Sequence, residues 1–143
     1  MNQVSTGIYV GAESSAEDQS MLQTHDIDTV ISLTHNTPAT GTSTRIDIPM
    51  VDGPQNDYQG FLNAVETVIE AREKEQRVLI HCAAGSSRSP AVAAAAIALR
   101  TDATLNEAFN QIIDRRPETD PHDALIRHAA RAIDQKTADS NTS

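Results

Sequence analysis

An apolar run that leads into a loop of small residues constrains the fold of this chain more than any other feature. The run "RVLIHC" at positions 77–82 is apolar almost throughout, as expected of a strand that is covered on both faces of a sheet. The loop that follows ends at Arg88, and an alanine-rich segment continues to Arg100, with Pro90 placed as in a first helical turn. Strand, loop and helix in this order predict an α/β fold with a largely parallel sheet.

Short strand-like runs and helical patterns alternate along the rest of the chain. In the predicted strand at 45–51, Pro49 indicates an edge strand or the end of the strand. We therefore expect a single domain with a central, mostly parallel, twisted sheet of about four or five strands, flanked by helices. The further strands are predicted at 7–10, 28–34 and 45–51, and the helices at 16–25, 57–76, 89–100, 104–115 and 120–133.

Length and charge limit the number of domains and the classes of partner. The 143 residues predict one domain, which we place at 1–135, followed by a small-residue, polar tail at 136–143 that we expect to be disordered. The net charge of -9 argues against nucleic acid or an anionic membrane surface as a partner, because both attract cationic proteins. The acidic, lysine-poor composition also resembles that of proteins adapted to high salt, which we keep as a hypothesis.

The single cysteine, Cys82, limits the compartment and the possible metal sites. It excludes a disulfide within the chain, and this favours the reducing cytoplasm. Cysteine and histidine residues do not cluster at ligand spacing, so we expect no metal and no other cofactor. The N-terminus lacks a basic region followed by an apolar core, and no apolar run approaches the ~18 residues of a membrane span. We therefore expect neither a targeting segment nor a membrane anchor.

The loop between the predicted central strand and its helix carries the chemistry. A loop of this length can curl so that its backbone N–H groups point into one cup that binds an anion. The following helix directs its positive end at the same cup, where it favours the ionised form of a thiol. The planar guanidinium of Arg88 matches two oxygens of a tetrahedral dianion, so we predict attack of the Cys82 sulfur on phosphorus. The residues between the two are Ala83, Ala84, Gly85, Ser86 and Ser87.

The segment "HCAAGSSRS" fits the signature His-Cys-x-x-Gly-x-Ser-Arg-Ser, and the chain thereby resembles the cysteine-dependent protein tyrosine phosphatases, in particular their dual-specificity branch. The stretches "GIYVGAESSAED", "IDTVISLT", "IDIPMVD" and "RRPETDP" are similar to other segments of that family, in the same order. The resemblance implies a protein tyrosine phosphatase-like fold. It also implies a metal-free enzyme that hydrolyses phosphotyrosine and phosphoserine or phosphothreonine on protein substrates, through a cysteinyl-phosphate.

The resemblance further implies a role for each residue of the motif. Cys82 is the nucleophile, and Arg88 clamps the phosphoryl oxygens together with the loop amides from Ala83 to Arg88. Ser89 donates a hydrogen bond to the sulfur and eases its departure, while His81 orders the loop and is not the proton donor. Asp52, in "IPMVDGPQND", stands where the family has its general acid. Asp57 is its nearest competitor, but its position suits the N-cap of the following helix.

Several other functions stay open on the sequence. A phosphatase of RNA 5′ ends or of small phosphoesters would use the same chemistry, although the acidic surface disfavours a polyanion. A module that binds phosphoproteins without turnover would need neither nucleophile nor acid. Lipid phosphatases would show lysines in the loop, and low-molecular-weight phosphatases and arsenate reductases carry the loop near the N-terminus. Structural alternatives are a buried thiol for Cys82, a turn for Asp52, a helix cap for Ser89, and surface or structural positions for His35, His122 and His128.

Overall fold

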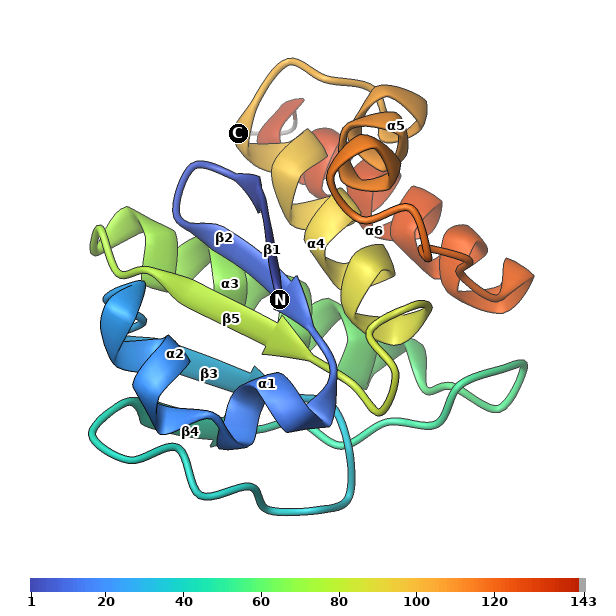
Figure 1. Ribbon diagram of the computed structural model, residues 1–143. Coiled ribbons are helices and arrows are strands. Elements are labelled where there is room, and N and C mark those ends of the chain that lie inside the picture. Colours follow the sequence, from blue (N-terminus) through green and yellow to red (C-terminus); the bar gives the residue numbers. More distant parts are fainter. Residues whose placement is uncertain (142–143) are drawn as a thin grey trace.

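The computed structural model describes residues 1–141, and its centre is a five-stranded sheet between two layers of helices (Figure 1). The strand order is β1-β2-β5-β3-β4, in which β1 is antiparallel to β2 and all other neighbours are parallel. The expected α/β architecture is confirmed, with β5 at the centre and β4 at an edge. The strands are β1 (Asn2–Ser5), β2 (Ile8–Gly11), β3 (Thr29–Ser32), β4 (Thr44–Asp47) and β5 (Val78–His81).

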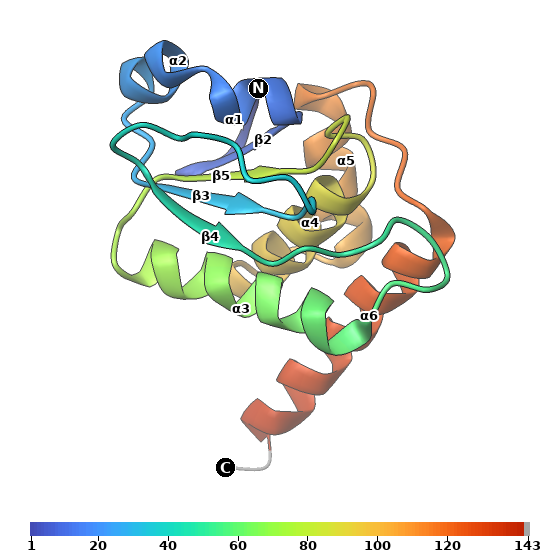
Figure 2. The ribbon, with the colours of Figure 1, turned by 90° about the horizontal axis from the view of Figure 1, so that it is seen from below.

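Helices cover both faces of the sheet, as Figures 1 and 2 show. The alternation of side chains along β5 separates the two layers of core: Val78 and Ile80 pack with the larger helical layer, and Leu79 packs with the smaller one. The smaller layer consists of α1 (Glu13–Glu17) and α2 (Gln19–Thr24). The larger layer consists of α3 (Tyr58–Glu73), α4 (Arg88–Arg100), α5 (Leu105–Arg115) and α6 (Asp123–Asn141).

Helix α4 is the centre of the larger layer because its side chains are small. It packs against β2, β5, α3, α5 and α6, and every residue from Ser89 to Ala98 is buried. The alanines in this stretch let the neighbouring helices approach closely, and their methyl groups lose little conformational entropy on burial. The central strand and the helix that follows it are therefore the most enclosed parts of the fold, and the loop between them starts and ends on rigid elements.

Several elements differ from the prediction, and the strand predicted at 45–51 is the shorter β4, which ends at Asp47. The strand β1 was missed, because "NQVS" has no apolar alternation and is held at the edge only by antiparallel pairing with β2. The predicted helix at 16–25 is two helices, since Asp18 ends α1 and its carboxylate caps α2 by accepting from the Met21 N–H at 3.0 Å. Helix α6 begins at Asp123 and continues to Asn141, so most of the predicted tail is helical.

Two side-chain contacts hold this extension of α6 against α3. The Tyr58 hydroxyl donates to Gln135 Oε1 at 2.7 Å, and Lys136 Nζ lies 2.8 Å from Glu66 Oε1. These contacts connect residues that are far apart in sequence, which explains why a polar local composition did not predict helix here. The last two residues of the predicted tail, 142–143, lie outside the described residues.

The parallel strands β2, β3, β4 and β5 all end at the same edge of the sheet. In open α/β sheets, the loops at the carboxyl ends of the strands are where ligands bind. The chain leaves β5 directly into the Cys82–Arg88 motif at this edge, and the segment with Asp52 leaves β4 at the same edge. The fold therefore brings the predicted nucleophile and the predicted acid to one place.

Candidate active site

Residues 82–88, which we name the phosphate loop, are held from outside through their carbonyl oxygens. Four consecutive carbonyls accept hydrogen bonds from three residues elsewhere in the chain, and these bonds set the path of the loop. The pairs are Glu13 N to Ala83 O at 3.3 Å, Arg116 Nη2 to Ala84 O at 3.2 Å, Arg116 Nε to Gly85 O at 2.7 Å and Asp120 N to Ser86 O at 2.6 Å.

These bonds also decide where the amides of the loop point. The described peptide bonds are trans, so each N–H is directed away from the carbonyl oxygen of the same peptide unit. With the carbonyls turned outward to their donors, the N–H groups of residues 84–87 are turned to the opposite side of the loop. This is the arrangement that a cup of amide donors for an oxyanion requires.

Gly85 is required by this geometry. Its φ of +71° lies in the left-handed region, and a Cβ there would stand 2.5 Å from Arg116 Nη2 and 2.7 Å from the carbonyl atoms of Gly11. Any side chain at this position would therefore displace either the arginine or the backbone at the end of β2. The glycine lets Arg116 reach both carbonyls at once.

Arg116 is the functional residue that sequence reasoning missed. Its side chain is almost entirely buried, and besides the two loop carbonyls it donates to Asn2 Oδ1 at 2.7 Å. Glu118 lies 3.8 Å away and balances its charge. The sequence contained only a weak signal, the arginine pair in "RRPETDP", because nothing local distinguishes the buried Arg116 from the exposed Arg115.

Cys82 is buried where the phosphate loop meets α4. Its Sγ lies 3.2 Å from Ser89 Oγ, and the Ser89 backbone N–H donates to the sulfur at 3.5 Å. Ser89 is itself fully buried, so both contacts are shielded from water. The sulfur therefore lies at the N-terminus of α4, beside one backbone N–H and one hydroxyl group of Ser89.

Arg88, the first residue of α4, reaches from the phosphate loop to the segment that follows β4. Its Nη1 donates to the backbone oxygen of Met50 at 3.0 Å, and the side chain is half-buried. This bond uses one of the five N–H donors of the guanidinium. Residues 48–57, which we name the acid loop, are thus attached directly to the loop that carries Cys82.

Asp52 lies in the acid loop and contacts the phosphate loop through a side chain. The Ser87 hydroxyl donates to Asp52 Oδ1 at 2.6 Å, whereas Asp52 itself is exposed. The competitor, Asp57, occupies the N-cap of α3, where its carboxylate accepts from the Gly60 N–H at 3.2 Å. The structure therefore brings Asp52 to the phosphate loop and uses Asp57 as a helix cap.

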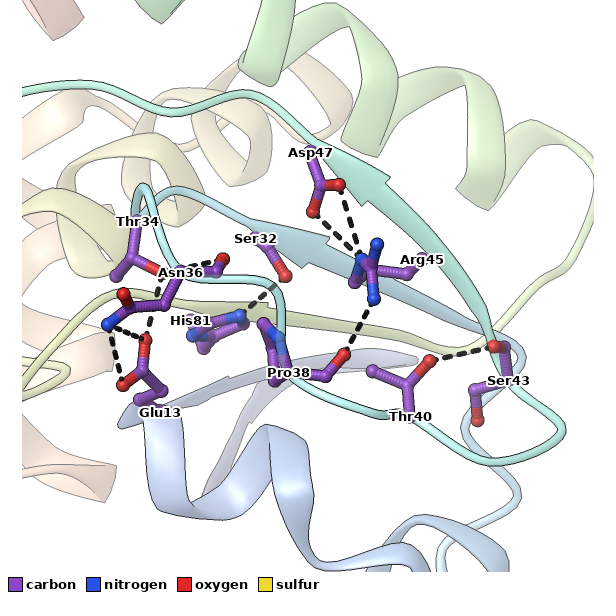
Figure 3. Close-up of polar contacts among 10 residues, drawn as sticks. All are labelled: Glu13, Ser32, Thr34, Asn36, Pro38, Thr40, Ser43, Arg45, Asp47 and His81. Atoms are coloured by element: carbon purple, nitrogen blue, oxygen red, sulfur yellow. Dashed lines mark hydrogen bonds and ion pairs between the residues drawn. The ribbon is translucent and has the colours of Figure 1, made fainter.

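His81 ends β5 and is fully buried beside Cys82. Its Nε2 lies 2.6 Å from the hydroxyl of Ser32 on β3 (Figure 3), and its Nδ1 has no hydrogen-bond partner among residues 1–141. Burial lowers the pKa of His81, because the charged ring would lose its hydration. The ring lies at the strand end from which the phosphate loop starts, and its contact with Ser32 connects β5 to β3.

A polar cluster next to the phosphate loop was also missed. Glu13 accepts from Thr34 Oγ1 at 3.0 Å and from Asn36 Nδ2 at 3.1 Å, which fastens the segment after β3 to α1 (Figure 3). The Glu13 backbone meanwhile anchors Ala83. One residue thus connects two of the segments at this edge of the sheet, a role that no local sequence pattern indicates.

Among residues 1–141, no group of three or more histidine, cysteine, aspartate or glutamate side chains is arranged to hold a metal ion. Within the same residues, no helix combines the length and the apolar character that crossing a bilayer requires.

Comparisons with known proteins agree on one family. Residues 8–132 match the dual specificity phosphatase catalytic domain. Curated relatives include the dual specificity protein phosphatase Mpk3 of Drosophila melanogaster, 30% identical over 120 residues, which are 80% of this chain and 29% of that protein. Another is the tyrosine-protein phosphatase vhp-1 of Caenorhabditis elegans, 31% identical over 125 residues, which are 83% of this chain and 19% of that protein.

Solved structures show the same fold at lower sequence identity. Human DUSP28 superposes with a TM-score of 0.89 at 18% identity, covering 97% of this chain and 99% of that one. The human tyrosine phosphatase-like serine/threonine/tyrosine-interacting protein superposes with a TM-score of 0.81 at 22% identity, covering 100% of this chain and 98% of that one. The chain spans less than a third of the length of the first curated relatives. By its sequence match and its fold, the chain belongs to the dual specificity phosphatase catalytic-domain family.

Proposed function

We propose that this domain hydrolyses phosphate monoesters of tyrosine, serine and threonine on proteins, through a cysteinyl-phosphate. The observation that carries the proposal is the phosphate loop itself. Its carbonyls point outward, so a row of its amides faces the opposite side. The sulfur of its first residue, Cys82, lies beside the hydroxyl and the N–H of Ser89, and its Ser87 donates a hydrogen bond to the carboxylate of Asp52. A nucleophile, a set of oxyanion donors and a proton donor are thus assembled within one loop and its neighbour.

In the first step, the Cys82 thiolate attacks phosphorus, so an S–P bond forms while the P–O bond to the substrate breaks. The loop amides and Arg88 stabilise the three equatorial oxygens, on which negative charge is spread in the transition state. The leaving oxygen takes a proton from the carboxylic acid of Asp52, which becomes a carboxylate. The products are the dephosphorylated alcohol or phenol and the phosphocysteine.

In the second step, water attacks the phosphocysteine and gives a proton to the Asp52 carboxylate. The S–P bond breaks, and the sulfur leaves as a thiolate that accepts hydrogen bonds from the Ser89 hydroxyl and N–H, 3.2 and 3.5 Å away. These bonds are worth most when the sulfur carries a full negative charge, so they favour this departure. Inorganic phosphate is released, and Asp52 is protonated again for the next cycle.

The side chains of the loop support activity on short as well as long phosphorylated residues. Ala83 and Ala84 are exposed and carry only methyl groups, so the side chains of the loop do not deepen the pocket around the sulfur. A phosphoserine, whose phosphate lies close to its backbone, needs such a low rim to reach the nucleophile. The curated relatives named dual specificity protein phosphatases support the same breadth of substrates.

The main alternative is binding without turnover. The fold alone does not separate the two, since it is shared by a human protein described as tyrosine phosphatase-like and interacting. A binding module would need the amides and Arg88, but it would need neither a sulfur beside the Ser89 hydroxyl and N–H nor a tethered carboxylate. The presence of both in this chain favours the enzyme.

A substrate panel tests the proposal. It contains an aryl phosphate, phosphopeptides of all three hydroxyl types, phosphoinositides and RNA 5′ ends, each assayed with a chelator at low and at high salt. We expect hydrolysis of the aryl phosphate and the phosphopeptides that the chelator leaves unchanged. Turnover confined to RNA ends or lipids would contradict the proposed protein substrates. Binding of phosphopeptides without any turnover would contradict catalysis and favour the binding module. The salt arms test the hypothesis of adaptation to high salt.

A further inference from the structure

Two hydrogen bonds in series connect three segments beside the predicted general acid. The Ser87 hydroxyl lies 2.6 Å from Asp52 Oδ1, and the backbone N of His122 lies 2.9 Å from the same hydroxyl oxygen. Ser87 is only 6% exposed, whereas Asp52 lies on the surface. Within residues 1–141, Ser87 is the one hydrogen-bond or ion-pair partner of the Asp52 carboxylate. An exposed acid is therefore held by a single buried tether.

The direction of both bonds follows from their chemistry. A backbone N–H can only donate, so the His122 amide must use a lone pair of the Ser87 hydroxyl. The single hydrogen of that hydroxyl then points to Asp52 Oδ1, which accepts it. With Oδ1 engaged as an acceptor, the proton of the neutral Asp52 sits on Oδ2. One oxygen of the carboxyl group is thus held, and the other is the one that can donate.

The amide that orients Ser87 is itself fixed at the start of α6. The His122 ring accepts from the Ala124 N–H at 3.0 Å, and the His122 carbonyl accepts from the Leu125 N–H at 2.9 Å. The preceding Pro121 restricts the backbone on the other side. The tether therefore starts from a rigid helix end and passes through the phosphate loop to the acid loop.

We propose that Ser87 is the positioning residue of the general acid: its hydroxyl, oriented by the His122 amide, holds Oδ1 of Asp52 so that Oδ2 presents the proton to the leaving group. This role belongs to the side chain of Ser87 and is separate from the contribution of its amide to the oxyanion cup. It rests on the proposed function of Asp52 as general acid.

The test compares Ser87→Ala, Asp52→Ala and the double variant in turnover of a series of aryl phosphates whose leaving phenols range from good to poor. Loss of a general acid slows poor leaving groups most, by about 10²-fold or more. We expect Ser87→Ala to lower kcat for the poorest leaving group about tenfold and to leave the best one nearly unchanged. In the Asp52→Ala background, the same change should cost less than about twofold, because the two residues act as one unit. Ser20→Ala, a serine replacement on the exposed surface of α2, is the matched control and should behave as the parent.

A second readout separates positioning from a general structural role. Inhibition by inorganic phosphate reports on the amide cup and Arg88, so its constant should stay within about twofold of the parent value in Ser87→Ala. A second variant, Ser87→Thr, keeps the hydroxyl and should retain the leaving-group dependence of the parent. The inference is overturned by a uniform loss over all leaving groups, by weaker phosphate inhibition, by full additivity with Asp52→Ala, or by a Ser87→Thr variant that behaves as Ser87→Ala. If Asp52→Ala itself shows no dependence on the leaving group, the assignment of the acid fails instead.

Discussion

The phosphate loop and the acid loop meet at one site, but they are held to different degrees by their own backbone. The phosphate loop is attached through its own backbone, with four carbonyls bonded to donors from α1, Arg116 and Asp120. The acid loop is attached through its backbone at its start, where the Ile48 and Met50 N–H groups donate to the Ser32 and Leu33 carbonyls. Beyond that start it is attached to the phosphate loop by side chains, since Arg88 donates to the Met50 carbonyl and Ser87 donates to Asp52. Val51 and Asp52 at its tip are exposed.

The difference in how the two loops are held follows from their proposed tasks, which are to stabilise the transition state and to donate a proton. Oxyanion donors stabilise a transition state only when they are already in place, so the cup needs a fixed backbone. A proton donor must meet leaving groups of several shapes and later a water molecule, so it needs an accessible carboxyl group on a short tether. Substitutions in the two loops should therefore separate into those that change affinity for phosphate and those that change dependence on the leaving group.

The largest expected effect is that of Cys82→Ser. It removes the nucleophile but keeps the amides and Arg88, so turnover should fall at least about a thousandfold while phosphate or a phosphopeptide still binds. Single-turnover assays and calorimetric titration measure the two quantities. Turnover retained in this variant would remove the covalent mechanism and with it the distinction between the loops.

The second-largest effect is expected for Asp52→Ala, in which the fall in turnover should depend on the leaving group of the substrate. Because a good leaving group needs no proton, we expect a fall of about 10²- to 10³-fold for a poor leaving group and much less for an activated aryl phosphate. Asp57→Ala is the matched control, since it removes a neighbouring carboxylate that caps α3. The control should lower stability by about 1 kcal/mol in urea unfolding and keep the parent dependence on the leaving group; the reverse result would move the acid to Asp57.

Arg116→Met should weaken phosphate binding by the phosphate loop. The substitution removes both donors to the Ala84 and Gly85 carbonyls, so we expect inhibition by inorganic phosphate to weaken about tenfold and stability to fall by about 2–3 kcal/mol. The decline in turnover should be similar for all leaving groups. Arg115→Met, at the exposed neighbouring arginine, is the control and should change neither quantity. A loss confined to poor leaving groups would contradict the separation of the two loops.

The smallest expected effect concerns His81 and the pH dependence of stability. Burial lowers the pKa of His81 in the folded chain, whereas the unfolded chain takes up the proton at the ordinary value of about 6.5. The unfolded state thus binds more protons below that pH, so the contribution of His81 to stability is present above about pH 6.5 and is lost as the pH falls. The slope is at most about 1.4 kcal/mol per pH unit. Urea unfolding between pH 7.5 and 5 should show a shallower pH dependence for His81→Gln than for the parent, and equal slopes would exclude His81 as the cause.

Most of the fold was predictable because its signals are local. The apolar run of β5, the capping box of Thr104 and Glu107 that opens α5, and the N-cap of Asp57 each depend on residues within a few positions of one another. The predicted tail is helical as far as residue 141, and contacts of Gln135 and Lys136 with α3, which no local window contains, hold α6 where this stretch begins. The roles of the site residues and the cytoplasmic location remain predictions.

The sequence by itself determined the strand, the five-residue loop and the helix around Cys82 and Arg88, because a nucleophile and its oxyanion donors can lie on one short stretch of backbone. Only the tertiary structure decided what holds that stretch in shape. Arg116 behind the loop and Glu13 beside it come from segments that are distant along the chain, and so do Asp52 and His122, the two partners of the Ser87 hydroxyl. Their contacts depend on how the sheet and helices pack, and packing is a property of the whole chain rather than of any segment.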